Sequence, residues 1–366
     1  MKIVYCIKSL HPSGGTERVL TTKMNFLAEH TECSVYVILQ DEQGAPFFQL
    51  SPKVHRISLR VKGKRDYRIA LEQTLISLRP DVTVCVGGQE LSFINDLKDG
   101  SKKVLEFHYT KNFLVNFVKG IRRIPFKSLH LLKVWLIQKR LAHYVKKFDL
   151  VVGLTARDVQ LWGSPVNMTY VYNPLSFRSS VKSTTQNKEI ISVGSFTPAK
   201  GMDLLVEAFG RIALRYPDWR LSIYGSGQDY NLLKELIAQY HIESQVSLYE
   251  PVRNIGDKMV ESSIYAFPSR SDGFGLVLTE AMECGLPCVA FDCECGPREI
   301  LSPDTGILVP PQDINGFAHA LARLMDSDSL RKNMGERAAE EVSRFYPENI
   351  MPRWLELFNK LVKNSL

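Results

Sequence analysis

Short apolar runs rich in β-branched residues alternate with longer amphipathic stretches along most of this chain of 366 residues. A short, continuously apolar run is typical of a strand that is buried on both faces of a parallel sheet. Parallel strands need long crossover connections, and the amphipathic stretches between the runs have the length of helices. The alternation therefore predicts an α/β fold in which helices cover both faces of a parallel sheet.

The alternating pattern occurs twice. In the first half the expected strands are Ile3–Ile7, Ser34–Leu39, Val82–Val86, Val104–Phe107 and Leu150–Leu154, and the expected helices are Gly15–Glu29, Tyr67–Leu78 and Leu129–Lys147. In the second half the expected strands are Glu189–Val193, Arg220–Tyr224, Val246–Leu248, Ile264–Phe267 and Cys288–Phe291, and the expected helices are Met202–Tyr216, Gln228–Gln239, Leu276–Cys284 and Ile314–Met325. Two doubly wound sheets are therefore expected, with ligands bound beyond the carboxyl ends of their strands.

A break in the pattern separates the two halves. It begins at Tyr172-Asn173-Pro174, and a polar stretch follows. We expect a Rossmann-like N-terminal domain over residues 1–173, a linker over 174–188 and a Rossmann-like C-terminal domain over 189–346. The last segment, 347–366, is apolar from Trp354 to Val362 and is expected to pack back on the N-terminal domain.

The composition is that of an ordinary globular protein, with 45% hydrophobic and 23% charged residues, which excludes a disordered or fibrous chain. Seven scattered cysteines do not suit a disulfide framework, and their odd number indicates reduced thiols of a cytosolic protein. No run approaches the ~18 apolar residues of a membrane-spanning helix, and the apolar N-terminus is too short for a signal peptide. These features predict a cytoplasmic protein.

Positive charge is concentrated in one segment. The chain has 46 Lys and Arg against 39 Asp and Glu, yet residues 107–148 contain no acidic residue. The ten basic residues of this segment are Lys111, Lys119, Arg122, Arg123, Lys127, Lys133, Lys139, Arg140, Lys146 and Lys147. Elsewhere 36 basic residues face 39 acidic ones, so the rest of the chain carries a net charge of −3.

Large apolar side chains lie between these basic residues, and three interpretations remain open. The segment is a helix with a solvated basic face, a surface for an anionic membrane or a lipid-linked anionic acceptor, or a nucleic-acid site. Near an anionic membrane each Lys or Arg contributes roughly 1 kcal/mol. No nucleic-acid motif accompanies the segment, so we expect no nucleic-acid partner. The residues expected to meet a membrane or acceptor are Lys119, Arg122, Arg123 and Lys127, which would place the protein peripherally on the inner face of the cell membrane.

A glycine pair follows the first expected strand, in Gly14-Gly15-Thr16-Glu17-Arg18. Glycines let the backbone approach a ligand closely, and a helix N-terminus offers unpaired N–H groups to an anion. An ordinary strand-to-helix turn explains the segment equally well, and the third glycine of a dinucleotide fingerprint is missing.

A second glycine turn follows the strand that ends at Phe267, and a helix is expected from Leu276. The amides of Gly273, Phe274, Gly275 and Leu276 would point at a ligand, supported by a helix dipole of roughly half a unit charge.

Two carboxylates accompany this turn, Asp272 at the loop tip and Glu280 in the helix. Both can accept hydrogen bonds from hydroxyls, so the array fits a polyol beside a diphosphate. Taken singly, Asp272 is also explained as an N-terminal cap and Glu280 as part of a solvated helix face.

This segment closely resembles the retaining, nucleotide-sugar-dependent glycosyltransferases of family 4, which have the GT-B architecture of two Rossmann-like domains facing across a cleft. Their signature is a pair of acidic residues with seven between them. Here it reads Asp272-Gly-Phe-Gly-Leu-Val-Leu-Thr-Glu280-Ala-Met-Glu-Cys-Gly-Leu-Pro. Further matches in family order are Gly14-Gly15, Asn173-Pro174, Val193-Gly194, Lys200-Gly201, Tyr224-Gly225-Ser226-Gly227, Cys295-Gly296-Pro297-Arg298-Glu299 and Gly306-Ile307-Leu308-Val309.

The resemblance implies roles for the matching residues. The N-terminal domain would bind the acceptor and the C-terminal domain the nucleotide sugar. Lys200 would neutralise the donor diphosphate together with the amides of Gly15 and of residues 274–276, so no metal and no cofactor is expected. Glu280 would hold the ribose, and Asp272 and His108 would contact the transferred sugar. A partly buried structural histidine remains the alternative for His108.

Two positions depart from the family. The family usually has Arg where this chain has Ser195, and loss of a charge-assisted contact costs ~1.5–3 kcal/mol unless a neighbour replaces it. Arg270 is a candidate replacement on its place in the sequence. Asp272 stands where the family has Glu, one methylene longer.

The resemblance thus implies an enzyme that transfers a hexose from a nucleotide sugar, UDP-linked rather than GDP-linked, to a saccharide hydroxyl with retention. The expected acceptor is a lipid-linked glycan of bacterial surface polysaccharide. The alternatives are a nucleotide-sugar-binding or membrane scaffold protein with weak catalysis, and a nucleotide-sugar epimerase on the same fold.

Overall fold

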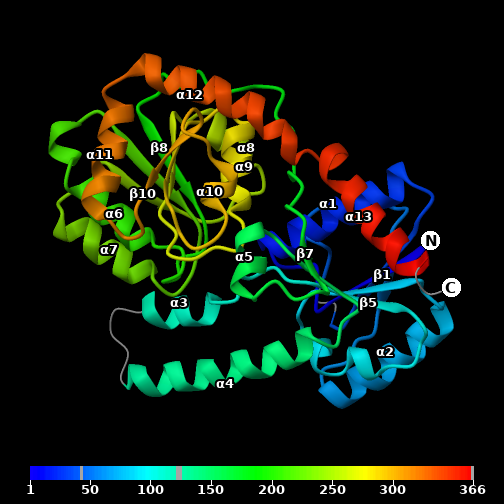
Figure 1. Ribbon diagram of the computed structural model, residues 1–366. Coiled ribbons are helices and arrows are strands. Elements are labelled where there is room, and N and C mark those ends of the chain that lie inside the picture. Colours follow the sequence, from blue (N-terminus) through cyan, green and yellow to red (C-terminus); the bar gives the residue numbers. More distant parts are fainter. Residues whose placement is uncertain (42–43, 121–125, 364–366) are drawn as a thin grey trace. The chain divides into compact units, whose positions relative to one another are not determined.

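The computed structural model describes residues 1–41, 44–120 and 126–363, which form two compact units (Figure 1). Unit 1 comprises Met1–Lys111, Lys133–Ser176 and Phe345–Leu366, and unit 2 comprises Asn112–Leu132 and Phe177–Arg344. Each unit contains one parallel sheet, so the predicted α/β fold with two Rossmann-like sheets is confirmed. Nothing in the sequence pattern indicates that 112–132 groups with unit 2.

Unit 1 is built on a seven-stranded sheet of order β3-β2-β1-β4-β5-β6-β7, in which every strand pair is parallel. Its strands are β1 (Lys2–Ile7), β2 (Ser34–Leu39), β3 (His55–Ser58), β4 (Val82–Cys85), β5 (Lys102–Glu106), β6 (Leu150–Gly153) and β7 (Met168–Tyr170). The helices that contribute to it are α1 (Gly15–His30), α2 (Lys64–Leu78), α4 (Lys127–Val145), α5 (Ala156–Leu161) and α13 (Pro347–Lys363), with 3-10 turns at Gln89–Ser92 and Ile94–Asp96.

Successive residues of β1 point into two different cores. Ile3 and Tyr5 belong to a cluster with α1 and α13, and Val4 and Cys6 belong to a cluster with α2. Successive side chains of a strand point to opposite faces, so helices cover both faces of β1. The C-terminal helix α13 contributes the fully buried Phe358 to the first cluster, so it is part of the core of unit 1.

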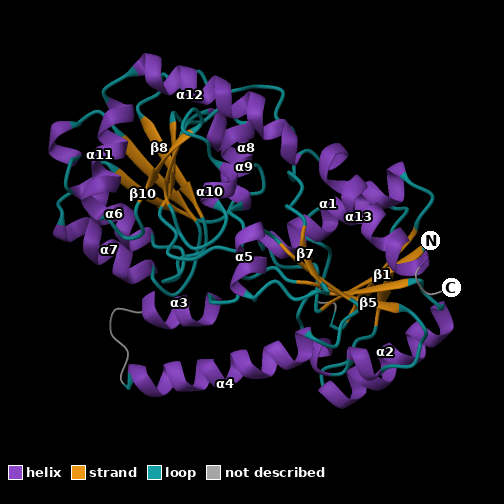
Figure 2. Cartoon of the chain, in the orientation of Figure 1, coloured by secondary structure: helices purple, strands orange, loops and turns teal. Residues whose placement is uncertain are grey.

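Unit 2 is built on a six-stranded parallel sheet of order β10-β9-β8-β11-β12-β13 between two layers of helices (Figure 2). Its strands are β8 (Glu189–Val193), β9 (Arg220–Tyr224), β10 (Val246–Tyr249), β11 (Ile264–Phe267), β12 (Cys288–Phe291) and β13 (Gly306–Val309). Its helices are α3 (Phe113–Gly120), α6 (Met202–Gly210), α7 (Tyr230–Gln239), α8 (Ile255–Val260), α9 (Leu276–Glu283), α10 (Pro297–Ile300), α11 (Ile314–Met325) and α12 (Asp328–Glu341), with 3-10 turns at Ala213–Arg215 and Val342–Phe345.

The ten strands expected from apolar runs are all present, within two residues of the predicted ends. The strands that the pattern missed, β3, β7 and β13, are edge strands of three or four residues. An edge strand is exposed along one side and does not need a continuous apolar run, so its sequence signal is weak.

One helix prediction was wrong in its length. The stretch Met202–Tyr216 forms α6 only as far as Gly210, and a 3-10 turn follows. The ring of Tyr240 lies so close to Gly210 that a Cβ there would be 2.5 Å from its Cγ. Gly210, the last residue of α6, is thus the point of close approach to this ring.

Candidate functional site

The order of the strands reverses between β8 and β11, and the segments that follow these two strands carry the predicted site of unit 2. At such a switch point two neighbouring loops leave the sheet in opposite directions and open a crevice beyond the strand ends. The segment after β8 contains Ser195 and Lys200, and the segment after β11 contains Arg270 to Gly275.

The backbone holds these two loops together. The carbonyl of Ala199 accepts hydrogen bonds from the amides of Arg270 (2.9 Å) and Ser271 (3.2 Å). Gly201 has a φ of 66°, and a Cβ at this position would lie 2.1 Å from the carbonyl oxygen of Pro268. Only glycine permits this close approach, so the glycine after Lys200 is required by the contact between the loops.

The structure brings Lys200 and Asp272 into an ion pair between the Lys200 Nζ and the Asp272 Oδ2. The lysine side chain is 31% exposed and the aspartate side chain 13% exposed. The pair is therefore open to solvent on the lysine side, where an anion can reach the ammonium group.

The other oxygen of Asp272 closes the turn before α9. Its Oδ1 accepts the amides of Phe274 (3.3 Å) and Gly275 (3.1 Å), so the capping interpretation of Asp272 describes part of its role. These two amides are used inside the loop in this conformation. Leu276 begins α9, and the first N–H groups of a helix have no intrahelical partner.

Glu280 lies in α9 with its side chain completely buried. The interpretation as part of a solvated helix face was therefore wrong. The ribose-binding role that the resemblance implies for Glu280 stays a prediction.

Arg270 does not replace the missing arginine at position 195. Its guanidinium forms a two-pronged ion pair with Asp203, with both N–O distances 2.7 Å, and also donates to the carbonyl of Pro198 at 2.9 Å. Both side chains are less than a tenth exposed. Arg270 therefore stabilises the Lys200 loop through Asp203 and the Pro198 carbonyl. Ser195 is exposed, with its Oγ 3.3 Å from the Thr197 Oγ1.

Sequence reasoning missed a set of contacts between α3 and this site. The side-chain amide of Asn112, the residue before α3, donates to the Glu294 Oε1 at 2.7 Å. The side-chain amide of Asn116 in α3 donates to the Glu294 Oε2 (3.3 Å) and the Ser271 Oγ (3.4 Å). The partners are more than 150 residues apart in the sequence, and no motif links them. Ser271 precedes Asp272, so α3 supports the loop that carries the ion pair.

In unit 1, Gly14 caps the N-terminus of α1 without a side-chain bond, and Gly15 is the exposed first residue of the helix. Arg18 donates its amide to the Gly14 carbonyl at 3.1 Å, as in any helix start. The geometry of the glycine pair is thus that of an ordinary strand-to-helix turn with an open helix N-terminus.

His108 follows β5 and is buried beside Glu106, with its Nε2 3.2 Å from the Glu106 Oε1. The other oxygen of Glu106 pairs with Lys23, which lies on the buried face of α1. A lysine at a core position of an amphipathic helix is the sequence signal that could have indicated a buried acidic partner.

The basic segment contains two helices. Lys119 lies in α3 and Lys127 begins α4, whereas Arg122 and Arg123 lie outside the described residues. Several large apolar residues in and beside α4 are exposed, each by 49% or more. They are Phe126, Leu129, Leu132, Trp135, Leu136 and Ile137. Among the described helices none is long and apolar enough to cross a membrane.

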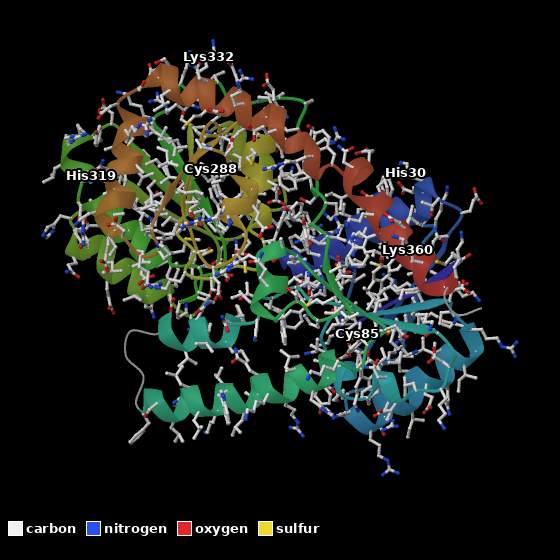
Figure 3. The ribbon with its side chains drawn as sticks, viewed as in Figure 1. His30, Cys85, Cys288, His319, Lys332 and Lys360 are labelled. Atoms are coloured by element: carbon white, nitrogen blue, oxygen red, sulfur yellow. The ribbon has the colours of Figure 1, made fainter. Side chains whose placement is uncertain are left out.

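All seven cysteines are free, and all but Cys33 are buried, Cys85 in β4 and Cys288 in β12 among them (Figure 3). Burial raises the pKa of the Cys288 thiol. Within the described ranges, no three His, Cys, Asp or Glu side chains form a group that could hold a metal ion.

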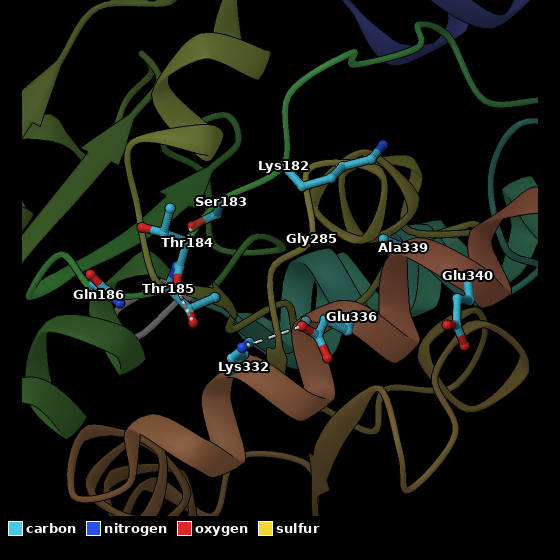
Figure 4. Close-up of a pocket in the computed structure, with 11 residues that line it drawn as sticks. Lys182, Ser183, Thr184, Thr185, Gln186, Gly285, Lys332, Glu336, Ala339 and Glu340 are labelled. Carbon is cyan, nitrogen blue, oxygen red and sulfur yellow. Dashed lines mark hydrogen bonds and ion pairs between the residues drawn. The ribbon is translucent and has the colours of Figure 1, made fainter.

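Unit 2 also has a hollow of about 480 Å³ between segment 182–186, Gly285 and α12 (Figure 4). None of its lining residues is a predicted site residue. Lys182 pairs with Glu283 at 2.7 Å, and Lys332 lies 3.9 Å from Glu336. The charged groups of this hollow thus have partners of their own.

Comparison with known proteins gives one family match and full-length relatives. Residues 176–341 match the family model described as glycosyl transferases group 1. The chain is 28% identical to an uncharacterized glycosyltransferase of Haemophilus influenzae, covering 96% of this chain and 98% of that protein. It is 25% identical to the amylovoran biosynthesis glycosyltransferase AmsD of Erwinia amylovora, covering 98% and 99%.

Among solved structures, the chain is similar to Anabaena Alr3699/HepE in complex with UDP-glucose. The TM-score is 0.76 at 17% identity, and the match covers 98% of this chain and all of that one. At this identity the likeness establishes the fold.

Proposed function

Because the chain belongs to the glycosyl transferases group 1 family and has the GT-B fold of two Rossmann-like sheets, we propose that it is a retaining hexosyltransferase. The donor is a nucleotide sugar, UDP-linked rather than GDP-linked, and the acceptor is a saccharide hydroxyl. The observation that carries the proposal is the partly exposed Lys200–Asp272 pair at the switch point of unit 2.

The Lys200 ammonium of this ion pair is a positive charge to which a donor diphosphate can bind. As the diphosphate enters, its oxygens replace Asp272 as partners of the Lys200 ammonium, and Asp272 is released to accept hydrogen bonds from sugar hydroxyls. Negative charge on the diphosphate grows while the glycosidic bond breaks, so the lysine stabilises the transition state more than the bound substrate. The Leu276 amide and the positive end of the α9 dipole add to this effect.

Retention follows from attack on the face that the leaving group occupies. The acceptor oxygen bonds to the anomeric carbon as the bond to the diphosphate oxygen breaks, and that phosphate oxygen takes the acceptor proton. No side-chain nucleophile takes part. Glu280 is proposed to bind the ribose, and His108 to contact the transferred sugar.

The amylovoran relative supports a role in surface polysaccharide synthesis, with a lipid-linked glycan as the acceptor. The helix α4 supports binding to an anionic membrane, because it exposes Leu132, Trp135 and Leu136 beside Lys133, Lys139 and Arg140. Exposed apolar groups next to cations suit insertion at a lipid surface. The protein would then act peripherally on the inner face of the cell membrane.

A panel of UDP-sugars and GDP-sugars, with and without a metal chelator, tests the donor. We expect slow hydrolysis of one UDP-hexose without acceptor and transfer with a saccharide acceptor, both unaffected by the chelator. Binding of UDP without turnover of any donor would favour a nucleotide-sugar-binding scaffold. Release of an epimerised sugar without acceptor would favour an epimerase.

Sedimentation with vesicles containing phosphatidylglycerol tests the membrane surface. The double variant Leu132→Ser with Leu136→Ser should bind these vesicles less than the unaltered protein and hydrolyse the donor at the same rate. Leu214→Ser is the matched control, since Leu214 is an apolar residue of unit 2 that is 97% exposed. Equal sedimentation of all three proteins would leave α4 as a solvated helix.

A further inference from the structure

A chain of buried polar contacts in unit 1 leads from the C-terminal helix to the end of β5. Trp354 of α13 lies over the ammonium of Lys23, with the Nζ 3.3 Å from the ring centroid. Lys23 pairs with Glu106 at 2.5 Å, and Glu106 lies 3.2 Å from the Nε2 of His108. The side chains of Lys23, Glu106 and His108 are each no more than 3% exposed.

Charge decides which form each group takes. Burial alone would raise the pKa of Glu106, but the Lys23 ammonium and the His108 imidazole outweigh it and bring this pKa to about 2. Burial lowers the pKa of Lys23 to about 8, against the effect of Glu106. Glu106 is therefore ionised at neutral pH and can only accept hydrogen bonds.

The ionised carboxylate constrains the imidazole. The contact is electrostatic, since neither the Glu106 Oε1 nor the His108 Nε2 has a hydrogen-bond partner among the described residues. A carboxylate oxygen 3.2 Å from a ring nitrogen repels a lone pair on it and attracts the hydrogen of an N–H group. The Nε2 therefore keeps its hydrogen, and the Nδ1 is the ring nitrogen left for a ligand. The other ionisable groups around this chain are Tyr5, whose ring lies 5.8 Å from the Lys23 Nζ, and Glu17 of α1.

We propose that Glu106 is the positioning residue of His108, with its carboxylate fixed by Lys23 so that the imidazole keeps its hydrogen on Nε2 and offers Nδ1 to the sugar of the donor. This inference rests on the proposed function in one respect, that His108 contacts the sugar of the donor. The orientation itself is a property of unit 1 and can be measured without any substrate.

The test of the orientation is the nitrogen spectrum of the full-length protein labelled with ¹⁵N-histidine, recorded over a series of pH values. His108→Gln identifies the signal among those of the eight histidines. In the unaltered protein we expect the hydrogen on Nε2. In Glu106→Gln the amide oxygen turns to Lys23, the NH₂ group faces the imidazole, and the hydrogen moves to Nδ1.

Glu90→Gln is the matched control. Glu90 is another buried carboxylate of unit 1, 1% exposed, and its partners are the Gly88 amide (3.1 Å) and the Cys85 thiol (3.4 Å). It should leave the His108 signal unchanged. Retention of the Nε2 hydrogen in Glu106→Gln, or the same shift in Glu90→Gln, would overturn the proposal.

The consequence for catalysis is measured with UDP-glucose, or with the sugar nucleotide that the donor panel selects. Glu106→Gln should lower kcat roughly 10- to 100-fold, the range that loss of the orienting partner of a metal-bound histidine costs, and change KM less than about twofold. Glu106→Asp keeps the charge and should recover both the Nε2 hydrogen and part of kcat. If His108→Gln is fully active, the role of His108 in the proposed function fails, while the spectrum still decides the orientation.

Discussion

The two units use a lysine–carboxylate pair in opposite ways. In unit 1, Lys23 and Glu106 are each about 1% exposed, whereas in unit 2 Lys200 and Asp272 are 31% and 13% exposed. Separating a buried pair leaves a charge without solvent, which costs several kcal/mol. Separating a pair that water or a ligand can reach costs little. Burial thus makes the first pair a fixed support and leaves the second free to exchange partners.

The largest expected effect is on the stability of the buried pair. Lys23→Met leaves the Glu106 carboxylate buried without its main cation, so we expect a loss of roughly 3–5 kcal/mol in the free energy of unfolding, measured in urea. The double variant Lys23→Met with Glu106→Gln removes both charges and should regain most of that loss. Additive losses would mean that the two side chains are not coupled, and the comparison would fail.

The second expectation concerns the free energy of unfolding at acidic pH. The pKa of Glu106 is about 2 in the folded protein, against 4.5 for an ordinary glutamate. Above about pH 4.5 the carboxylate is ionised in both states, so its contribution is complete; it is lost as the pH falls from about 4.5 toward 2. The difference in unfolding free energy between the unaltered protein and Glu106→Gln should therefore shrink over this window. A constant difference would contradict the charged state of Glu106.

The third expectation concerns the exposed pair of unit 2, Lys200 and Asp272. Lys200→Ala should lower kcat/KM for the donor about 10- to 100-fold, since a charge-assisted contact contributes about 1.5–3 kcal/mol. Its unfolding free energy should change by less than about 1 kcal/mol. Lys188→Ala is the matched control, because Lys188 forms an exposed pair of 2.9 Å with Asp218 in the same unit. Equal activity of both variants would remove Lys200 from the site.

The smallest effect is expected for Glu90. Its partners are a thiol and a backbone amide, and burial raises its pKa, opposite to the direction for Glu106. A neutral Gln suits such surroundings, so Glu90→Gln should cost less than about 1 kcal/mol of unfolding free energy. A cost as large as that of Glu106→Gln would show that burial alone, without the lysine, explains both positions.

Much of the fold was predictable because the strands in the middle of each sheet are buried on both faces. Their continuous apolar runs identified β1, β8 and β11, and the motif around Asp272 and Glu280 identified the loop after β11. The strand ends then indicated where a candidate site lies, because ligands of doubly wound sheets bind beyond them.

Two features could not be predicted because they depend on side-chain direction. Arg270 follows a loop that suggested a phosphate ligand, yet its guanidinium turns back to Asp203. Asn112, directly before α3, and Asn116 in α3 contact Glu294, which is far away in the sequence.

The sequence by itself determined the two parallel sheets and the resemblance to a glycosyltransferase family, since apolar periodicity and motif spacing are properties of the linear chain. Only the tertiary structure decided which charges are buried and which remain accessible. Lys23 and Lys200 are the same residue type, and what separates their roles is the solvent that packing leaves around each ammonium group.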